Sequence, residues 1–521
     1  MSIRQAVAVL FVLALSGCAP LTLREGETRD GYYFDTSVFE PLTRENAFIG
    51  EAVSVKALPS AADWVEKTPR VIWEGHASVE DAFSSAWTMV GEKIRHPAAG
   101  TNFKRDFVYT PFGKSVFVWG SCFITMFGEY AANVFPFIEQ LDNFYASQAK
   151  DGFIPRQLGI FDGRSQFAPS DLSSVGGNLF SWAELEWSRF SGDCSRLKRV
   201  YPVLLAYHRW LRENRTWKDG TYFSSGWGCG MDNIPRLDET RYNPAFHHGF
   251  LSWVDVTMQQ VFDARNLLEI ANRCGLPRAA ELEEEIAALT RIANERMWDE
   301  ELGLYCDLDR DGRRVRVRHI GGFWALLAGV APPDRARRLA ETMASDAFAA
   351  PCGTRSLAKG EKGYEHDGGN YWRGGVWCIT DWMCVRGLAA AGLSDSAHAL
   401  ARRQVEAVAS VFESTGTIWE SYDPEGLAAG KVYGQSVRSD FVGFSGVTPI
   451  AMLLRDVFGL EITPERITWK IRLLERHGVE NLTLPDGNVV SLICEARISA
   501  VEKPVVHVTS TRPVELVCVQ P

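Results

Sequence analysis

The sequence lacks the signatures of several large functional classes. It has no long run of Lys and Arg, and its formal net charge of −10 argues against nucleic acid as a partner. Beyond residue 18, no apolar stretch is long enough to cross a membrane as a helix. A Gly-x-Ser-x-Gly elbow is missing, and the glycine pairs at 321–322 and 368–369 lack the Lys of a phosphate loop. The common motifs of serine hydrolases and nucleotide-binding enzymes are therefore excluded.

Metal-ligand spacing is also missing. Apart from Cys18, the ten cysteines are scattered between Cys122 and Cys518 without a Cys-x-x-Cys pair, which argues against a zinc site. We therefore expect no bound metal and no cofactor. Export would permit disulfides, but the spacing of the cysteines assigns no pairing.

Aromatic residues, in contrast, are abundant. Hydrophobic residues make up 46% of the chain, enough for a large core, and 17 residues are Trp. Trp and Tyr rings often form the walls of sugar sites, although most Trp residues of a globular protein pack in its core. The aromatic content thus permits a carbohydrate site without locating it.

The N-terminus carries an export pattern. Residues 1–5 contain one Arg, residues 6–15 form an apolar run, and Ser16, Gly17 and Cys18 follow. The last residues resemble a bacterial lipobox, whose Cys is diacylated and becomes the mature N-terminus. We therefore expect an exported protein that is lipid-anchored through Cys18 to a bacterial membrane, in the periplasm or at the cell surface. The alternative is an ordinary cleaved signal peptide.

The pattern of apolar residues divides the remaining chain into three parts. Residues 19–75 show no clear helical period and are predicted to form a linker or N-terminal arm. Residues 76–460 repeat apolar positions at intervals of three and four, as in Leu282, Ile286 and Leu289, which is typical of amphipathic helices. Residues 461–521 alternate apolar and polar positions, which predicts a small C-terminal antiparallel β appendage.

The middle part is predicted to be mainly α. Helices that alternate with long polar loops favour an (α/α)6 barrel, because the long loops of this fold gather at one mouth and carry function. A helical solenoid is the alternative, but no repeat of fixed period is visible. The predicted helices span residues 78–95, 121–133, 136–149, 176–191, 195–214, 250–274, 278–298, 321–330, 333–345, 371–392, 394–413 and 446–458.

A glycine-rich loop at 225–236 contains the first candidate catalytic residue, Asp232. Glycines permit tight backbone approach and positive φ, and Pro235 prevents a helix from running through the segment. Such a loop can hold Asp232 in one orientation with Trp227 as an apolar wall. Apolar burial would raise the pKa of this carboxyl group, as a proton donor near neutral pH requires. An ordinary Gly/Asp turn is the alternative.

The second candidate is Glu420 in the segment 417–426, where it lies between the aromatic residues Trp419 and Tyr422. The neighbouring residues 423–426 are typical of a turn, so Glu420 is preferred over the acids beside it. Two carboxyl groups on separate loops at one barrel mouth are what glycoside hydrolysis requires. One protonates the departing oxygen, and the other activates water or attacks the anomeric carbon.

Five short segments occur in the order of a known family. They are residues 151–155, 230–236, 371–377, 418–424 and 441–446. With them the chain resembles the glycoside hydrolase family 63 group, which includes the bacterial mannosylglycerate hydrolase-like proteins, and more distantly the trehalases.

The resemblance implies an inverting exo-glycosidase with an (α/α)6 barrel that acts on an α-linked glucoside, mannoside or related glycan. It implies Asp232 as the general acid and Glu420 as the general base. The expected partner is an oligosaccharide or glycoside substrate. The residues expected to bind it are Trp119, Trp227, Arg236, Trp372, Arg373, Trp377, Trp419 and Phe444.

One position departs from the family pattern. The family usually has Trp-Asp where this chain has Trp119 followed by Gly120. If that Asp binds sugar hydroxyls, Gly120 removes a partner and shifts the preference among sugars.

Two other functions stay open at this point. A polysaccharide lyase or sugar epimerase on the same scaffold would need Tyr, His or Arg for proton transfer at a carbon acid. A glycan-binding lipoprotein without catalysis is favoured only by Gly120, and the presence of both acids argues against it.

Overall fold

The computed structural model describes residues 46–110 and 112–520. The predicted signal peptide and Cys18 lie outside these residues. Within them, no helix combines the length and the apolar character that crossing a membrane would need.

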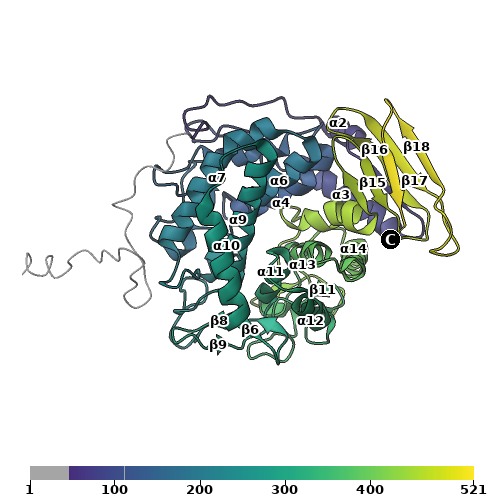
Figure 1. The fold of residues 1–521 in the computed structure, drawn as a ribbon. Coiled ribbons are helices and arrows are strands. Elements are labelled where there is room, and N and C mark those ends of the chain that lie inside the picture. The colour runs from purple at the N-terminus through teal and green to yellow at the C-terminus, as the bar shows by residue number, and fades with distance from the viewer. Residues whose placement is uncertain (1–45, 111, 521) are drawn as a thin grey trace, which may run out of the picture.

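Helices dominate the chain between residues 77 and 457 (Figure 1). Capping residues fix the ends of several of these helices. Gly192, with φ +76°, ends one helix, and the Asp193 side chain then accepts hydrogen bonds from the first backbone N–H groups of the next. The main helices are α3 (Ala77–Gly91), α4 (Val118–Gly128), α6 (Phe180–Ser191), α7 (Cys194–Asn214), α9 (Val254–Cys274), α10 (Ala280–Ile292), α12 (Pro333–Ala344), α13 (Cys378–Ala390), α14 (Ser394–Thr415) and the π-helix η9 (Thr448–Val457).

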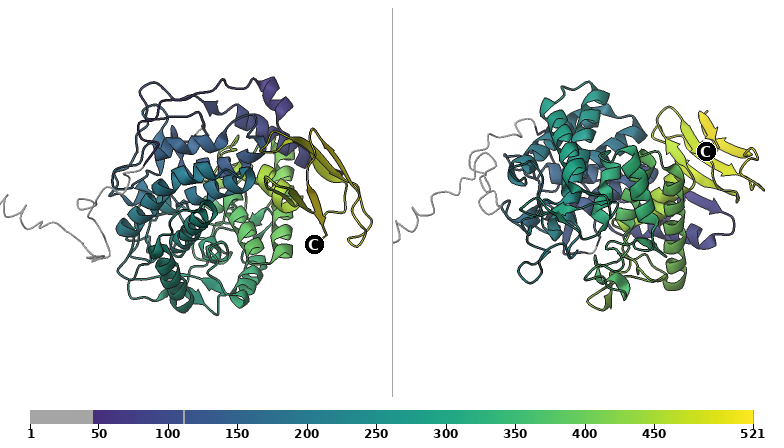
Figure 2. Two further views of the ribbon diagram at one scale, coloured as in Figure 1. Left: turned by 45° about the horizontal axis from the view of Figure 1, so that its top comes forward. Right: turned by 60° about the horizontal axis from the view of Figure 1, so that its bottom comes forward.

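Helices that follow one another in the chain pack side by side, and a late helix, α14, packs against the first, α3. Helix α7 packs on α9 and α9 on α10, while α13 packs on α14 and α14 on both η9 and α3. In the left view of Figure 2 the colour accordingly progresses round the helical body from blue through teal to green. Long loops at 215–253, 345–377 and 416–447 connect the helices.

Two of the predicted helices differ clearly in the structure. The predicted helix 371–392 begins only at Cys378, because residues 371–377 form a loop whose backbone leaves the helical region at Tyr371. The predicted helix 136–149 is a 3-10 turn, Phe137–Leu141, followed by the single turn α5 (Asp142–Tyr145).

The C-terminal part forms small β-sheets beside the helical body (Figure 1). Strands β16 (His477–Thr483), β17 (Val489–Cys494) and β18 (Val506–Ser510) form one antiparallel sheet, which β1 (Arg70–Trp73) joins by pairing with β16. The predicted N-terminal arm thus supplies an edge strand to this sheet.

The second sheet of this part corrects the expected pairing. It comprises β14 (Leu460–Ile462), β15 (Ile467–Lys470) and β19 (Leu516–Val519), and β15 pairs with β19 in parallel. The appendage is therefore not purely antiparallel, because its last strand reaches β15 by a crossover from the other sheet.

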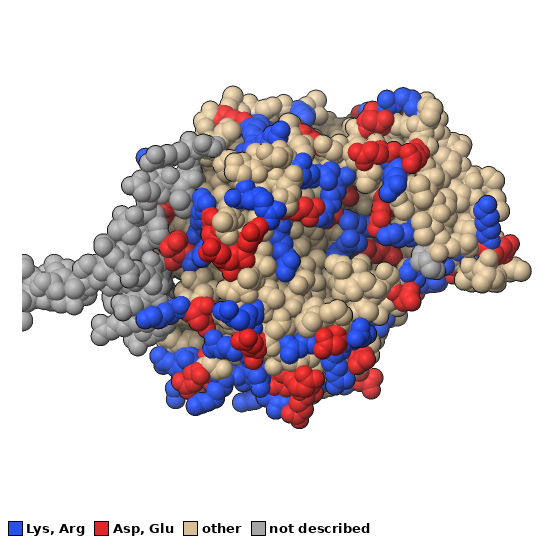
Figure 3. Space-filling view, viewed as in Figure 1, with Lys and Arg blue, Asp and Glu red and all other residues tan. Residues whose placement is uncertain are grey.

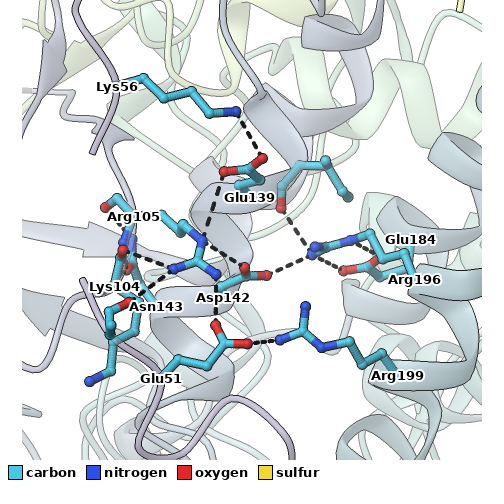
Figure 4. A network of polar contacts seen from close by, with 12 residues as sticks. Glu51, Lys56, Lys104, Arg105, Glu139, Asp142, Asn143, Glu184, Arg196 and Arg199 are labelled. Carbon is cyan, nitrogen blue, oxygen red and sulfur yellow. Dashed lines mark hydrogen bonds and ion pairs between the residues drawn. The ribbon is translucent and has the colours of Figure 1, made fainter. Parts of the chain in front are cut away.

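A network of ion pairs ties the N-terminal arm to the helical body (Figure 4). Glu51 pairs with Arg105 at 2.7 Å, and Arg105 pairs with Asp142 at 3.2 Å. Arg196 of α7 joins Asp142 to Glu184 of α6 at 2.9 and 2.8 Å. Because Asp142 and Glu184 are buried, loss of an arginine would leave an unpaired buried charge, and the network holds the arm in place.

Charges are mixed over the surface. On the face shown in Figure 3, basic and acidic side chains are interspersed, and no broad basic patch of the kind that nucleic acid needs is visible there.

Candidate active site

The loops between the helices enclose a cavity of about 290 Å³. Nine of its 21 lining residues are aromatic, and the polar groups that reach it are few, as is usual for small-molecule sites. The lining residues are Thr110, Phe112, Gly113, Phe117, Trp119, Gly120, Arg156, Gln157, Gln166, Gly176, Gly177, Trp227, Gly230, Asp232, Tyr371, Trp372, Trp377, Ile379, Glu420, Phe441 and Phe444. Asp232 and Glu420 therefore share one cavity.

The glycines around Asp232 are required by close packing. The short helix α8 (Gly226–Cys229) precedes it, with Ser225 as N-cap, and Gly230 ends the helix at φ +83°. A Cβ atom on Gly226 would lie 2.2 Å from the backbone oxygen of Asp232, and one on Gly230 would lie 2.9 Å from the Trp119 ring. Only glycine at these positions allows the chain to turn and present the Asp232 side chain to the cavity.

Burial raises the pKa of Asp232 to about 7, against an ordinary value of 3.8. Arg156 opposes this shift, the negative charge of Glu420 adds to it, and Arg438 opposes it again. Since Glu420 influences Asp232 electrostatically, the two carboxyl groups face the same small space. Asp232 is therefore able to carry a proton near neutral pH.

Glu420 differs from Asp232 in its hydrogen-bond partners. Its side chain is only 2% exposed, yet its two carboxylate oxygens accept separate hydrogen bonds. The hydroxyl of Tyr371 donates to one oxygen at 2.8 Å, and the guanidinium of Arg438 donates to the other at 2.7 Å. Two donors, one of them a cation, stabilise negative charge on Glu420. One carboxyl group is thus suited to donate a proton and the other to accept one.

Tyr371 reaches Glu420 from a strained backbone. Its φ of +71° lies in the region that favours glycine, and Asn370 before it has a φ of +31°. Asn233, the neighbour of Asp232, holds this turn from both sides. Its amide donates to the backbone oxygen of Asn370 at 3.0 Å and accepts from the backbone N–H of Trp372 at 2.9 Å.

Arg156 is a cavity residue that sequence reasoning missed. Its guanidinium lies over the rings of Phe117, Phe167 and Trp227, at 5.0 to 5.6 Å, and donates to the backbone oxygen of Trp227 at 3.1 Å. Burial lowers the pKa of Arg156 to about 10, so it stays protonated at neutral pH beside Asp232. Its position directly after the family-like segment 151–155 is the sequence feature that could have identified it.

Five of the eight residues expected to bind substrate line the cavity: Trp119, Trp227, Trp372, Trp377 and Phe444. The rings of Trp372 and Trp377 stack on each other at 4.1 Å with an angle of 3° between them. Each is only 1% exposed, so they form a rigid wall rather than a projecting platform.

The other three expected binding residues, Arg236, Arg373 and Trp419, do not belong to the described cavity lining. Arg236 is buried over the Trp253 ring and pairs with Asp255 at 2.8 Å, which gives it a role in the fold. Arg373 turns outward and pairs with Glu239, and Trp419 donates its indole N–H to Thr415 at 3.1 Å. Each has its polar group engaged elsewhere.

Gly120 opens part of the cavity wall. No atom would lie within 4 Å of a Cβ atom added there, so the backbone leaves space at the position where the family usually has Asp. In the described part of the chain, no cluster of His, Cys, Asp and Glu is arranged to hold a metal ion.

The family follows from comparison with known proteins. The model of the mannosylglycerate hydrolase MGH1-like glycoside hydrolase domain matches residues 116–434. The chain belongs to this family. The match contains Asp232 and Glu420, and it confirms the resemblance to glycoside hydrolase family 63. Residues 435–521, including Phe441 and Phe444 of the cavity, lie outside it.

Relatives of this glycoside hydrolase are distant. It is 25% identical over 391 residues to an uncharacterised protein of Borreliella burgdorferi, covering 72% of this chain and 78% of the relative. It is 28% identical over 360 residues to mannosylglycerate hydrolase MGH2 of Selaginella moellendorffii, covering 56% of this chain and 72% of the relative.

A solved structure shares the fold. The family 63 mannosylglycerate hydrolase of Thermus thermophilus, in complex with glucose, superposes with a TM-score of 0.56 at 22% identity. The superposition covers 72% of this chain and 99% of the Thermus protein. At this identity the likeness concerns the fold.

Proposed function

We propose that this glycoside hydrolase is an inverting exo-glycosidase with an (α/α)6 barrel, and that it cleaves an α-linked glucoside, mannoside or related glycan. The observation that carries the proposal is the pairing of Asp232 and Glu420 in one cavity, with burial favouring the proton on one and two donors favouring charge on the other. Inversion and the class of sugar are carried over from the family resemblance.

The two carboxyl groups would act in one concerted step. Asp232, protonated near neutral pH, donates its proton to the glycosidic oxygen as the bond to the anomeric carbon breaks. Glu420 takes a proton from the water that attacks the opposite face of that carbon.

Substitution of each acid tests the proposal. We expect Asp232→Asn and Glu420→Gln each to lower kcat by at least about a thousandfold on the best substrate of a glycoside panel, because each removes one proton transfer. The matched controls are Asp238→Asn and Glu413→Gln, which alter exposed acids in the same two regions. Near-normal rates in both cavity variants would overturn the proposal.

Analysis of the products tests inversion and exo-action. Proton NMR during hydrolysis should show first the anomer opposite to that of the substrate, and longer oligosaccharides should release one sugar at a time from an end. Appearance of the same anomer would contradict inversion while leaving hydrolysis intact.

We also propose that the chain is exported and lipid-anchored through Cys18, on the export pattern of its first residues. Mass spectrometry of the protein from bacterial membranes should find a diacylated Cys18 as the first residue. A protein that begins after an ordinary cleavage site and carries no lipid would contradict this.

A further inference from the structure

Two cysteines meet where helices α7 and α9 pack together. Cys194 is the first residue of α7, and Cys274 is the last residue of α9. The opposite ends of these helices lead into the loop 215–253, which carries Asp232. Each helix has 21 residues, so roughly 30 Å of helix separates the cysteines from that loop.

The sulfur atoms of Cys194 and Cys274 lie 2.8 Å apart. Nonbonded heavy atoms normally pack at roughly 3.5–4.0 Å, so this contact is closer than packing alone explains. Among the cysteines in residues 46–110 and 112–520, no other two sulfur atoms are hydrogen-bonded to each other. Cys194 is partly exposed and Cys274 is buried.

We propose that Cys194 and Cys274 form a disulfide bond in the mature protein. The partly exposed Cys194 thiolate attacks an exchanging disulfide, such as oxidised glutathione or an oxidoreductase disulfide, and releases one thiol. The Cys274 thiolate then attacks the mixed disulfide at Cys194 and releases the second thiol. The two cysteines thereby lose two protons and two electrons, and the external disulfide is reduced.

Peptide mapping of the protein refolded with oxidised glutathione tests the bond. We expect one cross-linked peptide pair that contains Cys194 and Cys274, and an intact mass lower by two hydrogen atoms. Because the bond closes a long loop in the unfolded chain, its reduction should lower Tm by about 4 °C. Activity should not change, since the bond lies far from the cavity.

Two variants sharpen the test. Cys194→Ser should lack the cross-link and show the lower Tm with or without reductant, whereas Cys518→Ser, which changes an exposed cysteine, should keep the cross-link. Alkylation of both Cys194 and Cys274 in the oxidised, denatured wild type would overturn the proposal, whatever the stability of the variants.

Asn233 connects the two halves of the candidate active site. Its side chain bonds to the residues on both sides of Tyr371, and Tyr371 donates to Glu420. The backbone N–H of Tyr371 also donates to the Lys431 oxygen at 2.7 Å. A tyrosine at φ +71° is held there only by such surrounding bonds.

We infer that Asn233 is a positioning residue, which fixes the Tyr371 hydroxyl on Glu420 and sets the base relative to the acid beside it. This inference rests on the proposed function. Without the Asn233 amide the turn relaxes, Tyr371 leaves Glu420, and the carboxylate loses one of its two donors.

Kinetics and a crystal structure together test this inference. Asn233→Ala should lower kcat by about tenfold to a hundredfold with little change in KM, because it disturbs the base rather than substrate binding. Tyr371→Phe should have the same effect, and the double variant should be no worse than either single one. The control Asn294→Ala removes a comparable side-chain bridge away from the cavity and should leave kcat unchanged.

The crystal structure of Asn233→Ala decides the question without activity. A Tyr371 side chain turned away from Glu420 would support the inference, and one still bonded to Glu420 would overturn it. Because this result needs no turnover, it is distinguishable from a failure of the proposed hydrolysis.

Discussion

The protonation of Asp232 should limit activity at alkaline pH. A general acid must carry its proton, and burial raises the pKa of Asp232 to about 7. Above that pH the protonated fraction falls about tenfold per pH unit, so kcat on a substrate with a poor leaving group should fall by the same factor. A substrate with an activated aryl leaving group should be less affected, since it needs little protonation.

The same shift has a consequence for stability. The folded-state pKa of Asp232 lies above the unfolded value of 3.8, so the folded chain holds this proton more tightly. Stability contributed by the protonated group is present below about pH 4 and is lost as the pH rises through about 7. A shift of about three pKa units corresponds to at most about 4 kcal/mol, and contact of Asp232 with cavity water reduces this to about 1–2 kcal/mol.

Asp232→Asn should therefore stabilise the inactive protein at alkaline pH. The amide has the same shape and is never charged, so the gain over wild type should grow to about 1–2 kcal/mol between about pH 4 and about pH 7. Urea denaturation of both proteins across this range measures it, with Asp238→Asn as an exposed control. A pH–rate profile that stays flat to about pH 9, or an Asn variant less stable at both ends, would refute the reasoning.

Three further predictions follow from the packing around the cavity. Arg236→Met should lower the free energy of unfolding by about 3–5 kcal/mol in urea denaturation, because it leaves the buried Asp255 without its ion-pair partner. Gly230→Ala should lower both stability, by about 1–3 kcal/mol, and kcat, because the added Cβ meets an indole ring at a positive φ. Gly120→Asp should leave Tm nearly unchanged, since no atom lies within 4 Å of its Cβ, but should change the ratio of kcat/KM between glucosides and mannosides at least about tenfold.

The sequence located the two acids because their surroundings are local. Asp232 follows a run of glycines that its tight turn requires, so the turn can be recognised in the sequence. Glu420 stands between two aromatic neighbours. The amphipathic helices were also readable, since burial of one face imposes a spacing of three and four residues. Each of these signals lies within a short stretch of chain.

Residues whose partners lie far away in the sequence could not be predicted from local patterns. Arg438 and Asn233 look like ordinary loop residues, and only the folded chain brings them to Glu420 and to the turn at Tyr371. Arg236 is the converse case. Its sequence neighbours suggest a binding residue, but Asp255 and Asp307 approach it from other elements and take up its charge.

By itself, then, the chain specified its helical class, the change to strands near residue 460 and the loops that carry two acids, since hydrophobic periodicity and turn chemistry are encoded between near neighbours. Tertiary structure alone decided which groups surround each acid, with Arg156 near Asp232 and with Tyr371 and Arg438 on Glu420. These surroundings depend on burial and on charges brought from remote segments, and the Coulomb and desolvation energies involved vary with distances in space rather than along the chain.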